Sequence, residues 1–363
     1  MQRQYRIEIF DNEFNPIGTS PISTPYINVD YLSVQESEIL CARRIDGIKP
    51  YYLAQIIADN GDILCKMLVS GCSYQKTAMT VYLRPLFSLL NVDGEDIDDG
   101  DGRGLWGYFV TAFRLAYAGS VVGETVNVPP TYAYIEYTQD EAIGAFSITG
   151  PKSSLNLLSL AQQYFQTDGV LFALSFDVNS KKITFDSRVV GNGGTLELDL
   201  DNVMDVEISD VPGVDSFNGV RMFVPHSKNG RYIETFVITD AGEIVRCTSD
   251  VTNYARPPVF KLTYEAAKDE NYTEYTEDEL KELASSHLSQ NTEPYLITST
   301  HAIEDKVFTQ GMADIGKKYA VYFNGSAYNT RLSGVALSGD TKTLTFGCYR
   351  NELTKILNMK GRG

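Results

Sequence analysis

The sequence has few of the residue types that build metal and catalytic centres. Only three of its 363 residues are histidines. His226, His287 and His301 lie far apart and lack the His-Glu-x-x-His spacing that puts two zinc ligands on one helical face. We expect His287 to be a packed or interface residue on the apolar side of a helix. The sequence also lacks the Gly-x-Ser-x-Gly turn of a hydrolase nucleophile. We therefore predict no catalytic residue, no metal ligand and no cofactor.

Cysteine is also sparse. The five cysteines are scattered, odd in number and without a Cys-x-x-Cys pair, a pattern that supports neither a disulfide framework nor a zinc site. Each lies in or beside an apolar run, where a free cysteine behaves as a small hydrophobic residue. We predict that all five are buried and reduced, namely Cys41, Cys65, Cys72, Cys247 and Cys348.

Positive charge is scarce. The chain has 31 Lys and Arg against 47 Asp and Glu, a net charge of -16. This balance argues against binding nucleic acid through its phosphates, which requires clustered cations. Walls of like charge would instead let DNA slide through a channel, although acidity can also serve solubility alone.

Long apolar runs are absent as well. The longest run falls far short of the roughly 20 residues that span a bilayer. No basic segment followed by an apolar one opens the chain, so no secretion signal is indicated. We expect a protein without a membrane span that is made in the cytoplasm.

The single tryptophan, Trp106, lies within an apolar run, so the sequence lacks an obvious aromatic platform for stacking sugars. This weakens a carbohydrate-binding adhesin. Glycoside hydrolysis needs two carboxylates about 5 to 9 Å apart. The sequence alone does not give the distance between any two acidic residues.

Three polar, glycine-containing segments are candidates for loops. Residues 100–104 and 191–194 are rich in glycine, but neither follows a buried strand and opens a helix as a phosphate loop does. Residues 93–101 carry six acids, yet Gly100 stands at the fifth position from Asp96 and no Glu stands at the twelfth, so the segment departs from a calcium-binding EF-hand. We interpret it as a solvated loop, with calcium binding as the alternative.

Alternating apolar and polar residues dominate the two ends of the chain. Tyr319, Val321 and Phe323 fall on one face of a predicted strand, the two-residue period of a half-buried strand. Turn-forming residues separate the other predicted strands near the two ends, which are residues 27–34, 39–45, 51–58, 63–69, 331–337 and 343–346.

The middle of the chain mixes helices and strands. Residues 105–118 are apolar almost all round and predict a buried helix, whereas residues 153–167 show one apolar face. Thr276-Glu-Asp-Glu279 is a capping box that predicts a third helix. The strands expected in this part are residues 169–178, 182–188, 195–200, 206–209, 219–224, 232–239 and 243–248.

These patterns predict an α+β, mainly β protein with several domains: two small β domains and an inserted α+β domain. The first β domain is expected at residues 1–92, completed by strands of residues 195–255. We place the inserted α+β domain at residues 93–194, a helix-containing linking domain at residues 256–305, and the second β domain at residues 306–363.

Three stretches resemble the tail-tip hub proteins of long-tailed bacteriophages that infect Gram-positive hosts, which are similar to the baseplate hub of contractile phages. The first is Tyr5-Arg-Ile-Glu-Ile-Phe10 followed by Asn15-Pro-Ile-Gly18. The second is the apolar run at residues 79–93 with its central Arg84-Pro85, and the third is Phe346-Gly-x-x-Arg350-x-x-Leu353-Thr354.

The resemblance implies a structural, non-enzymatic hub. In that family the ring is a homotrimer in which two β domains per subunit match the sixfold tail. The resemblance therefore implies that the β domains expected at residues 1–92 and 306–363 are β-barrel-like ring domains. It also implies a place at the virion tail tip below the distal tail protein, with receptor-binding or tail fibre proteins and the tape measure protein as partners. Host attachment, channel opening and DNA ejection would follow, with DNA passing without specific binding. A tail-associated cell-wall hydrolase and a carbohydrate-binding adhesin are the alternatives.

Overall fold

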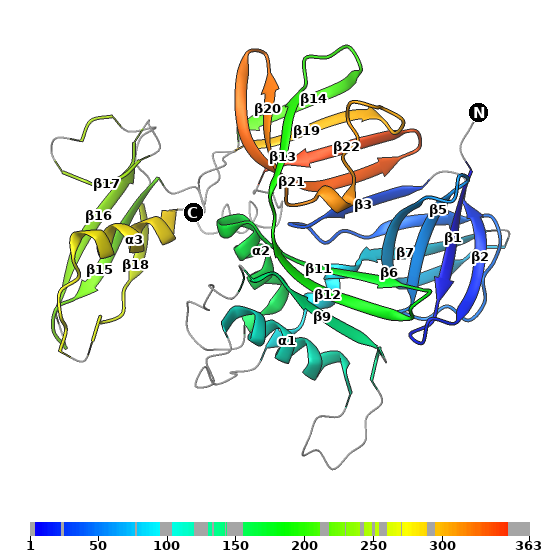
Figure 1. Cartoon of the computed structure of the whole chain (residues 1–363), viewed down its shortest axis with the longest axis horizontal. Coiled ribbons are helices and arrows are strands. Elements are labelled where there is room, and N and C mark those ends of the chain that lie inside the picture. Colours follow the sequence, from blue (N-terminus) through cyan, green and yellow to red (C-terminus); the bar gives the residue numbers. More distant parts are fainter. Residues whose placement is uncertain are drawn as a thin grey trace. The chain divides into compact units, whose positions relative to one another are not determined.

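The computed structural model describes residues 4–347 apart from residues 23–24, 77, 95–103, 120–129, 133, 142, 144–154, 211–217, 229, 240–242, 249–250, 254–259, 270 and 289–294. The chain divides into two compact units, and strands dominate the fold (Figure 1). Unit 1 comprises Met1–Ile208 and Ile297–Arg350, and unit 2 comprises Ser209–Leu296 and Asn351–Gly363. The predicted class, α+β and mainly β with several subdomains, is confirmed.

Unit 1 begins with a closed β-barrel. Its strands are β1 (Tyr5–Phe10), β2 (Pro16–Ile22), β4 (Ser37–Cys41), β5 (Leu53–Ala58), β6 (Ile63–Tyr74) and β7 (Met79–Pro85). They follow the order β1-β2-β4-β7-β6-β5, and β1 pairs with both β2 and β5 to close the barrel. Alternate residues point inward, so Ile7 and Ile9 of β1 and Val81 and Leu83 of β7 are fully buried.

We expected strands of residues 195–255 to complete this barrel, and that expectation is wrong. All six strands come from residues 5–85, and a closed barrel leaves no free edge for another strand. Two strands account for the difference. In β2, Pro16 and Gly18 lower the strand propensity. The apolar run that begins at residue 79 starts as strand β7, which a turn of 3₁₀ helix, η1 (Leu86–Leu90), then follows.

The second assembly of unit 1 is a seven-stranded sheet. Its strands are β3 (Tyr26–Asp30), β13 (Asn192–Glu197), β14 (Val203–Asp210), β19 (Tyr295–Ala302), β20 (Lys318–Phe323), β21 (Ser326–Ser338) and β22 (Thr341–Phe346). The order is β13-β20-β21-β22-β19-β14, and β3 pairs with β21. Asn324 and Gly325 have φ of 49° and 74°, the left-handed geometry of the tight turn between β20 and β21. A second 3₁₀ turn, η5 (Met312–Asp314), precedes β20.

This sheet differs from the ring domain expected at residues 306–363. The three strands predicted there exist as β20, β21 and β22, but β3, β13, β14 and β19 come from outside that range. The strand predicted at residues 27–34 leaves the barrel and pairs with β21 instead. A hydrophobic period shows that a strand exists, but not which sheet contains it.

The third assembly of unit 1 is an α/β layer formed by residues 93–189. It contains α1 (Gly104–Tyr117), β9 (Ile135–Gln139), α2 (Leu157–Asp168), β11 (Val170–Asp177) and β12 (Lys182–Val189), with β8 (Asp93–Gly94) pairing β10 (Leu155–Asn156). The strands form a sheet in the order β11-β12-β9. From α1, Phe109 stacks on Phe172 of β11 with ring centroids 3.9 Å apart. The hairpin and both helices predicted here are present.

The start of α2 is a correction. The helix was predicted over residues 153–167, and residues 153–154 lie outside the described part of the chain. The N-cap is Asn156, whose side chain accepts a hydrogen bond from Ser159 N at 3.2 Å. Gly169, with φ 71°, ends the helix in the left-handed conformation.

Unit 2 is a four-stranded sheet with a helix on one face. Its elements are β15 (Gly219–Pro225), β16 (Arg231–Ile238), β17 (Ile244–Arg246), β18 (Phe260–Tyr264) and α3 (Glu277–Leu288). The strand order is β17-β16-β15-β18, with β18 parallel to β15. Residues 209–255 and residues 256–296 therefore contribute strands and a helix to one unit. The sequence had instead predicted a separate linking domain at residues 256–305. None of the described helices is both long enough and apolar enough to cross a membrane.

Candidate interaction sites in the two units

Tyr31, directly after β3, connects the seven-stranded sheet to the α/β layer. Its ring centroid lies 4.9 Å from that of Phe87 and 4.7 Å from that of Phe165. Its hydroxyl donates to Phe172 O at 3.0 Å and accepts from Phe172 N at 3.1 Å. Burial raises the pKa of Tyr31, so the hydroxyl keeps the proton that it donates. The hydroxyl thus satisfies both backbone groups of Phe172, as a neighbouring β-strand would do.

Arg331 of β21 makes the second connection. Its side chain is buried, and its guanidinium donates to Phe165 O and, at 3.0 Å, to Gln166 O in the last turn of α2. These carbonyls have no partner within the helix and form the negative end of its dipole. Gly169 lies against the guanidinium, because a Cβ on it would be 3.4 Å from the Arg331 Cζ atom. A buried cation therefore ties the seven-stranded sheet to α2.

A cavity of about 630 Å³ lies where β6, β11, β12 and η5 meet in unit 1. Lys66 of β6 closes one side of it by donating to Phe176 O. In β11, the peptide N–H and C=O of Phe172 point away from β12 and toward Tyr31. The peptide groups of Leu174, two residues later, point the same way, toward the cavity. The lining is mostly apolar, with Leu171 and Phe172 among its residues.

The described lining of this cavity has few groups that could act in catalysis. Asp186 is the one carboxylate among its described lining residues, so the cavity does not hold the carboxylate pair that glycoside hydrolysis uses. Burial raises the pKa of the Cys65 thiol to about 12, which keeps it a thiol rather than a nucleophilic thiolate. Apolar walls with a few polar groups are typical of a ligand-binding pocket.

His301 lies in the core of the seven-stranded sheet. It is fully buried, its ring stacks on Phe308 at 3.7 Å, and its Nε2 atom lies 2.9 Å from Ser299 Oγ. Desolvation, together with the nearby Lys342 ammonium, lowers its pKa to about 4. Lys342 is itself buried and donates to Phe308 O and, at 2.8 Å, to Gln310 O. His301 is therefore a neutral packing residue at neutral pH.

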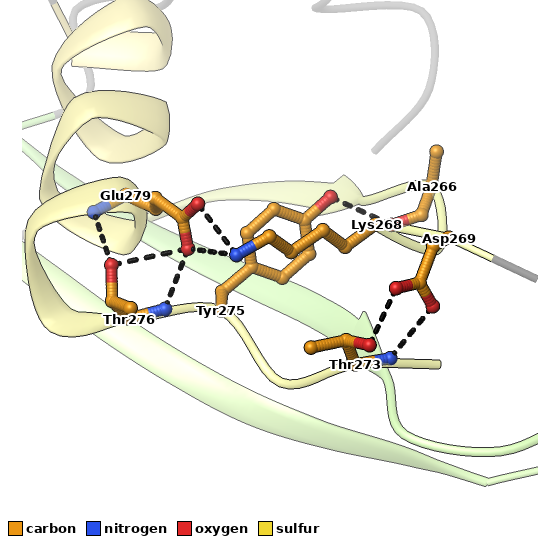
Figure 2. A network of polar contacts seen from close by, with 7 residues as sticks. All are labelled: Ala266, Lys268, Asp269, Thr273, Tyr275, Thr276 and Glu279. Carbon is orange, nitrogen blue, oxygen red and sulfur yellow. Dashed lines mark hydrogen bonds and ion pairs between the residues drawn. The ribbon is translucent and has the colours of Figure 1, made fainter. Parts of the chain in front are cut away.

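In unit 2, a polar network holds the segment between β18 and α3 (Figure 2). Asp269 accepts hydrogen bonds from Thr273 N at 3.0 Å and from Thr273 Oγ1. Lys268 pairs with Glu279 at 2.6 Å. Glu279 also accepts from Thr276 N at 2.7 Å, and Thr276 Oγ1 accepts from Glu279 N at 3.4 Å, which confirms the predicted capping box.

The three histidines belong to different units. His226 and His287 belong to unit 2, and His301 belongs to unit 1. His287 lies 2.9 Å from Glu265, whose pKa the hydrogen bond lowers. Over the described residues, no group of three or more His, Cys, Asp or Glu side chains is placed to hold a metal ion.

The cysteines follow the prediction in part. Cys41 and Cys65 are buried, Cys72 and Cys247 are only half-buried, and none of these four cysteines forms a disulfide. Cys348 lies outside the described residues. The half-buried pair shows that an adjacent apolar run does not by itself place a thiol in the core.

The glycine-rich and acidic segments have different outcomes. Residues 191–194 were expected to be a flexible loop, and that is wrong, because β13 begins at Asn192 and Gly193 lies so close to Tyr319 that a Cβ would be 2.1 Å from its ring. Of residues 93–101, Asp93 is exposed and accepts from Asn156 Nδ2 at 3.1 Å. Residues 95–103 lie outside the described part, so calcium binding and a solvated loop both stay predictions.

Neither known protein families nor curated protein sequences match this chain. Solved structures do. The 43 kDa tail protein of prophage MuSo2 from Shewanella oneidensis aligns with a TM-score of 0.52 at 12% identity, over 94% of this chain and 98% of that chain. The prophage tail protein gp18 from Listeria monocytogenes EGD-e aligns with a TM-score of 0.52 at 9% identity, over 98% of each chain. The chain has the fold of prophage tail proteins. The resemblance to phage tail proteins is thereby confirmed for the fold.

Sequence reasoning missed Tyr31 and Arg331, the residues that connect the seven-stranded sheet to the α/β layer. Arg331 opens a predicted strand, where an arginine reads as an exposed polar position. Its burial depends on the carbonyls of a helix that ends 163 residues earlier in the chain, at Asp168. A local sequence pattern cannot predict a partner that is so distant in the chain.

Proposed function

We propose that the chain is a structural hub of a bacteriophage tail tip or baseplate, where copies of it form a ring or cap below the distal tail protein. The observation that carries the proposal is the shared fold: two prophage tail proteins align with almost their whole length to almost the whole of this chain. A full-length likeness supports a common architecture rather than one shared module.

The geometry of unit 1 supports a ring role. It presents a closed barrel and a seven-stranded sheet, and Tyr31 and Arg331 tie that sheet to the α/β layer. A homotrimer would place six such β assemblies around one axis, which is what a sixfold tail needs. Closure of the barrel also removes edge strands that would otherwise invite uncontrolled association.

As a hub at the virion tail tip, the chain would contact the distal tail protein, receptor-binding or tail fibre proteins, and the tape measure protein. Channel opening during host attachment and passage of DNA without specific binding complete the role. The net charge of -16 supports such passage, because like charge keeps phosphates from adhering to the wall. In this role the chain is not an enzyme.

Two measurements test the proposal. Gold-labelled antibodies against the chain should mark the tail tip of intact virions in electron micrographs, and labelling of the capsid or no labelling would refute it. Purified full-length chain should release no muropeptides from peptidoglycan. Reproducible release that a single Asp or Glu substitution abolishes would favour the cell-wall hydrolase instead.

A further inference from the structure

Among the described residues of unit 2, α3 covers one face of the sheet, and most side chains on the other face are exposed. Val220, Met222 and Phe236 point toward the helix with Leu280 and Leu288. The alternate residues of β15, β16 and β18 point to the other side. We call this side the open face, and its members are Arg221, Phe223, Arg231, Ile233, Phe260, Leu262 and Tyr264.

The open face exposes a continuous apolar surface over adjacent strands. Ile233 is 57% exposed, Leu262 61% and Tyr264 71%. In strand register, Leu262 lies beside Arg221 and Tyr264 beside Phe223, and Phe223 in turn pairs with Ile233. Single exposed apolar residues are ordinary, whereas a contiguous group of this kind marks an interaction site.

Two arginines stand on the aromatic rings of this face. The guanidinium carbon of Arg221 lies 4.4 Å from the centroid of Phe260, and that of Arg231 lies 5.3 Å from the centroid of Tyr264. Tyr264 also stacks on Phe223, with centroids 4.7 Å apart and planes at 14°. Stacking holds both cations in place without neutralising them.

The open face has no acid of its own. Among the described strand residues that point to this side, none is Asp or Glu. By contrast, Arg246 and Lys268 of the same unit pair with Glu234 and Glu279. Among the described residues neither Arg221 nor Arg231 forms an ion pair, and the Arg231 guanidinium donates to Phe223 O at 3.3 Å. Their charges are therefore available to carboxylates from outside the unit.

Polar contacts hold the segment that follows β18, the outer strand of the open face. Beyond Tyr264, the network of Asp269, Thr273 and Glu279 fixes the connection from β18 to α3 (Figure 2). A surface whose side chains are already ordered loses less conformational entropy when it binds. Arginine and tyrosine in such a setting are the residue types that most often dominate binding energy.

We infer that the open face of unit 2 docks on an acidic surface of a second copy of this chain. Charge complementarity carries the choice of occupant: the face is cationic, and the chain as a whole has a net charge of -16. A contact of this face with the same face of another copy is disfavoured, because it would bring four arginines together with no Asp or Glu among the described strand residues. The contact is therefore heterologous, and heterologous contacts that close produce rings. The inference names a contact surface for the ring of the proposed function and rests on it.

The experiment measures self-association of the full chain by sedimentation velocity over a range of protein and salt concentrations. Arg221→Glu with Arg231→Glu reverses both cations of the open face. Lys228→Glu with Lys281→Glu is the matched control, because it makes the same charge change on exposed cations outside the open face. Leu262→Ser is a second test variant that changes no charge. Fluorescence of Trp106 and far-ultraviolet circular dichroism check that each variant folds.

We expect wild type and control to associate alike and more weakly at high salt. The double arginine variant should associate at least about tenfold more weakly, and Leu262→Ser should weaken association at every salt concentration. Association of the double arginine variant at wild-type strength would overturn the inference. A wild-type chain that stays monomeric throughout would also overturn it, while tail-tip labelling of virions would still uphold the proposed function.

Discussion

Acidification should destabilise unit 1 through His301 at pH values where few other groups titrate. In the unfolded chain its pKa has the ordinary value of 6.5, and in the fold it is about 4. Between these values the unfolded chain binds a proton and the folded chain does not, so stability is complete above pH 6.5 and falls as the pH falls toward 4. At pH 5 the loss is about 2 kcal/mol, from roughly 1.4 kcal/mol per pKa unit.

The structure explains why the ring stays neutral. A charged imidazole would lie in a fully buried site near the Lys342 ammonium, and its Nδ1 atom has no hydrogen-bond partner among the described residues. Both features oppose a second proton on the ring. Asp305 acts in the other direction, and its effect is smaller.

The assay is urea unfolding between pH 7.5 and pH 5, followed by fluorescence. The single tryptophan, Trp106, lies in α1 and packs 5.1 Å from Phe185, so the signal reports unit 1. His301→Gln cannot titrate and is the reference. Wild type should lose about 2 kcal/mol more than this variant over the pH range. Equal losses in the two proteins would refute the buried, neutral histidine.

Three further predictions use the connecting residues and the cap of α3. Arg331→Leu should destabilise unit 1 by about 3 kcal/mol by leaving two buried carbonyls of α2 unpaired, and a loss below about 1 kcal/mol in the same urea assay would contradict the connection. Tyr31→Phe keeps the ring but removes the hydroxyl between Phe172 N and O, so we expect a loss of about 1 to 3 kcal/mol with unchanged fluorescence of the folded state. Thr276→Ala should destabilise unit 2 by about 1 kcal/mol in thermal unfolding followed by circular dichroism, while the Trp106 transition stays at the wild-type position.

Local patterns identified most of the elements in this protein. The period of two predicted β20, β21 and β22, and the capping box at Thr276 predicted α3, because each signal lies within a few neighbouring residues. The prediction of the fold class followed from the same patterns, since strands outnumber helices along the whole chain.

Partnership between distant strands was not readable in the same way. β3 resembles its barrel neighbours in sequence, yet it pairs with β21. β18 joins β15 in parallel, although residues 226–259 separate them. Pairing of this kind depends on which exposed edge lies nearest in the folded chain, and a single sequence does not record it. The open face of unit 2 was missed for the same reason, because its members come from separate strands.

The strand order of unit 1 has a consequence for the time course of folding. Every strand of the barrel lies within residues 5–85, so the barrel can form while the ribosome is still at work. The seven-stranded sheet cannot, because β3 must wait for β21, about 300 residues later, which takes roughly 15 to 60 s at roughly 5 to 20 residues per second.

During that interval β3 and β13 have no partner strands, and unpaired edges promote association with other unfinished chains. Slow, low-temperature expression should therefore raise the yield of folded protein more than it does for a protein made of the barrel alone. A chaperone that shields strand edges would act on this chain chiefly before β20 to β22 are made.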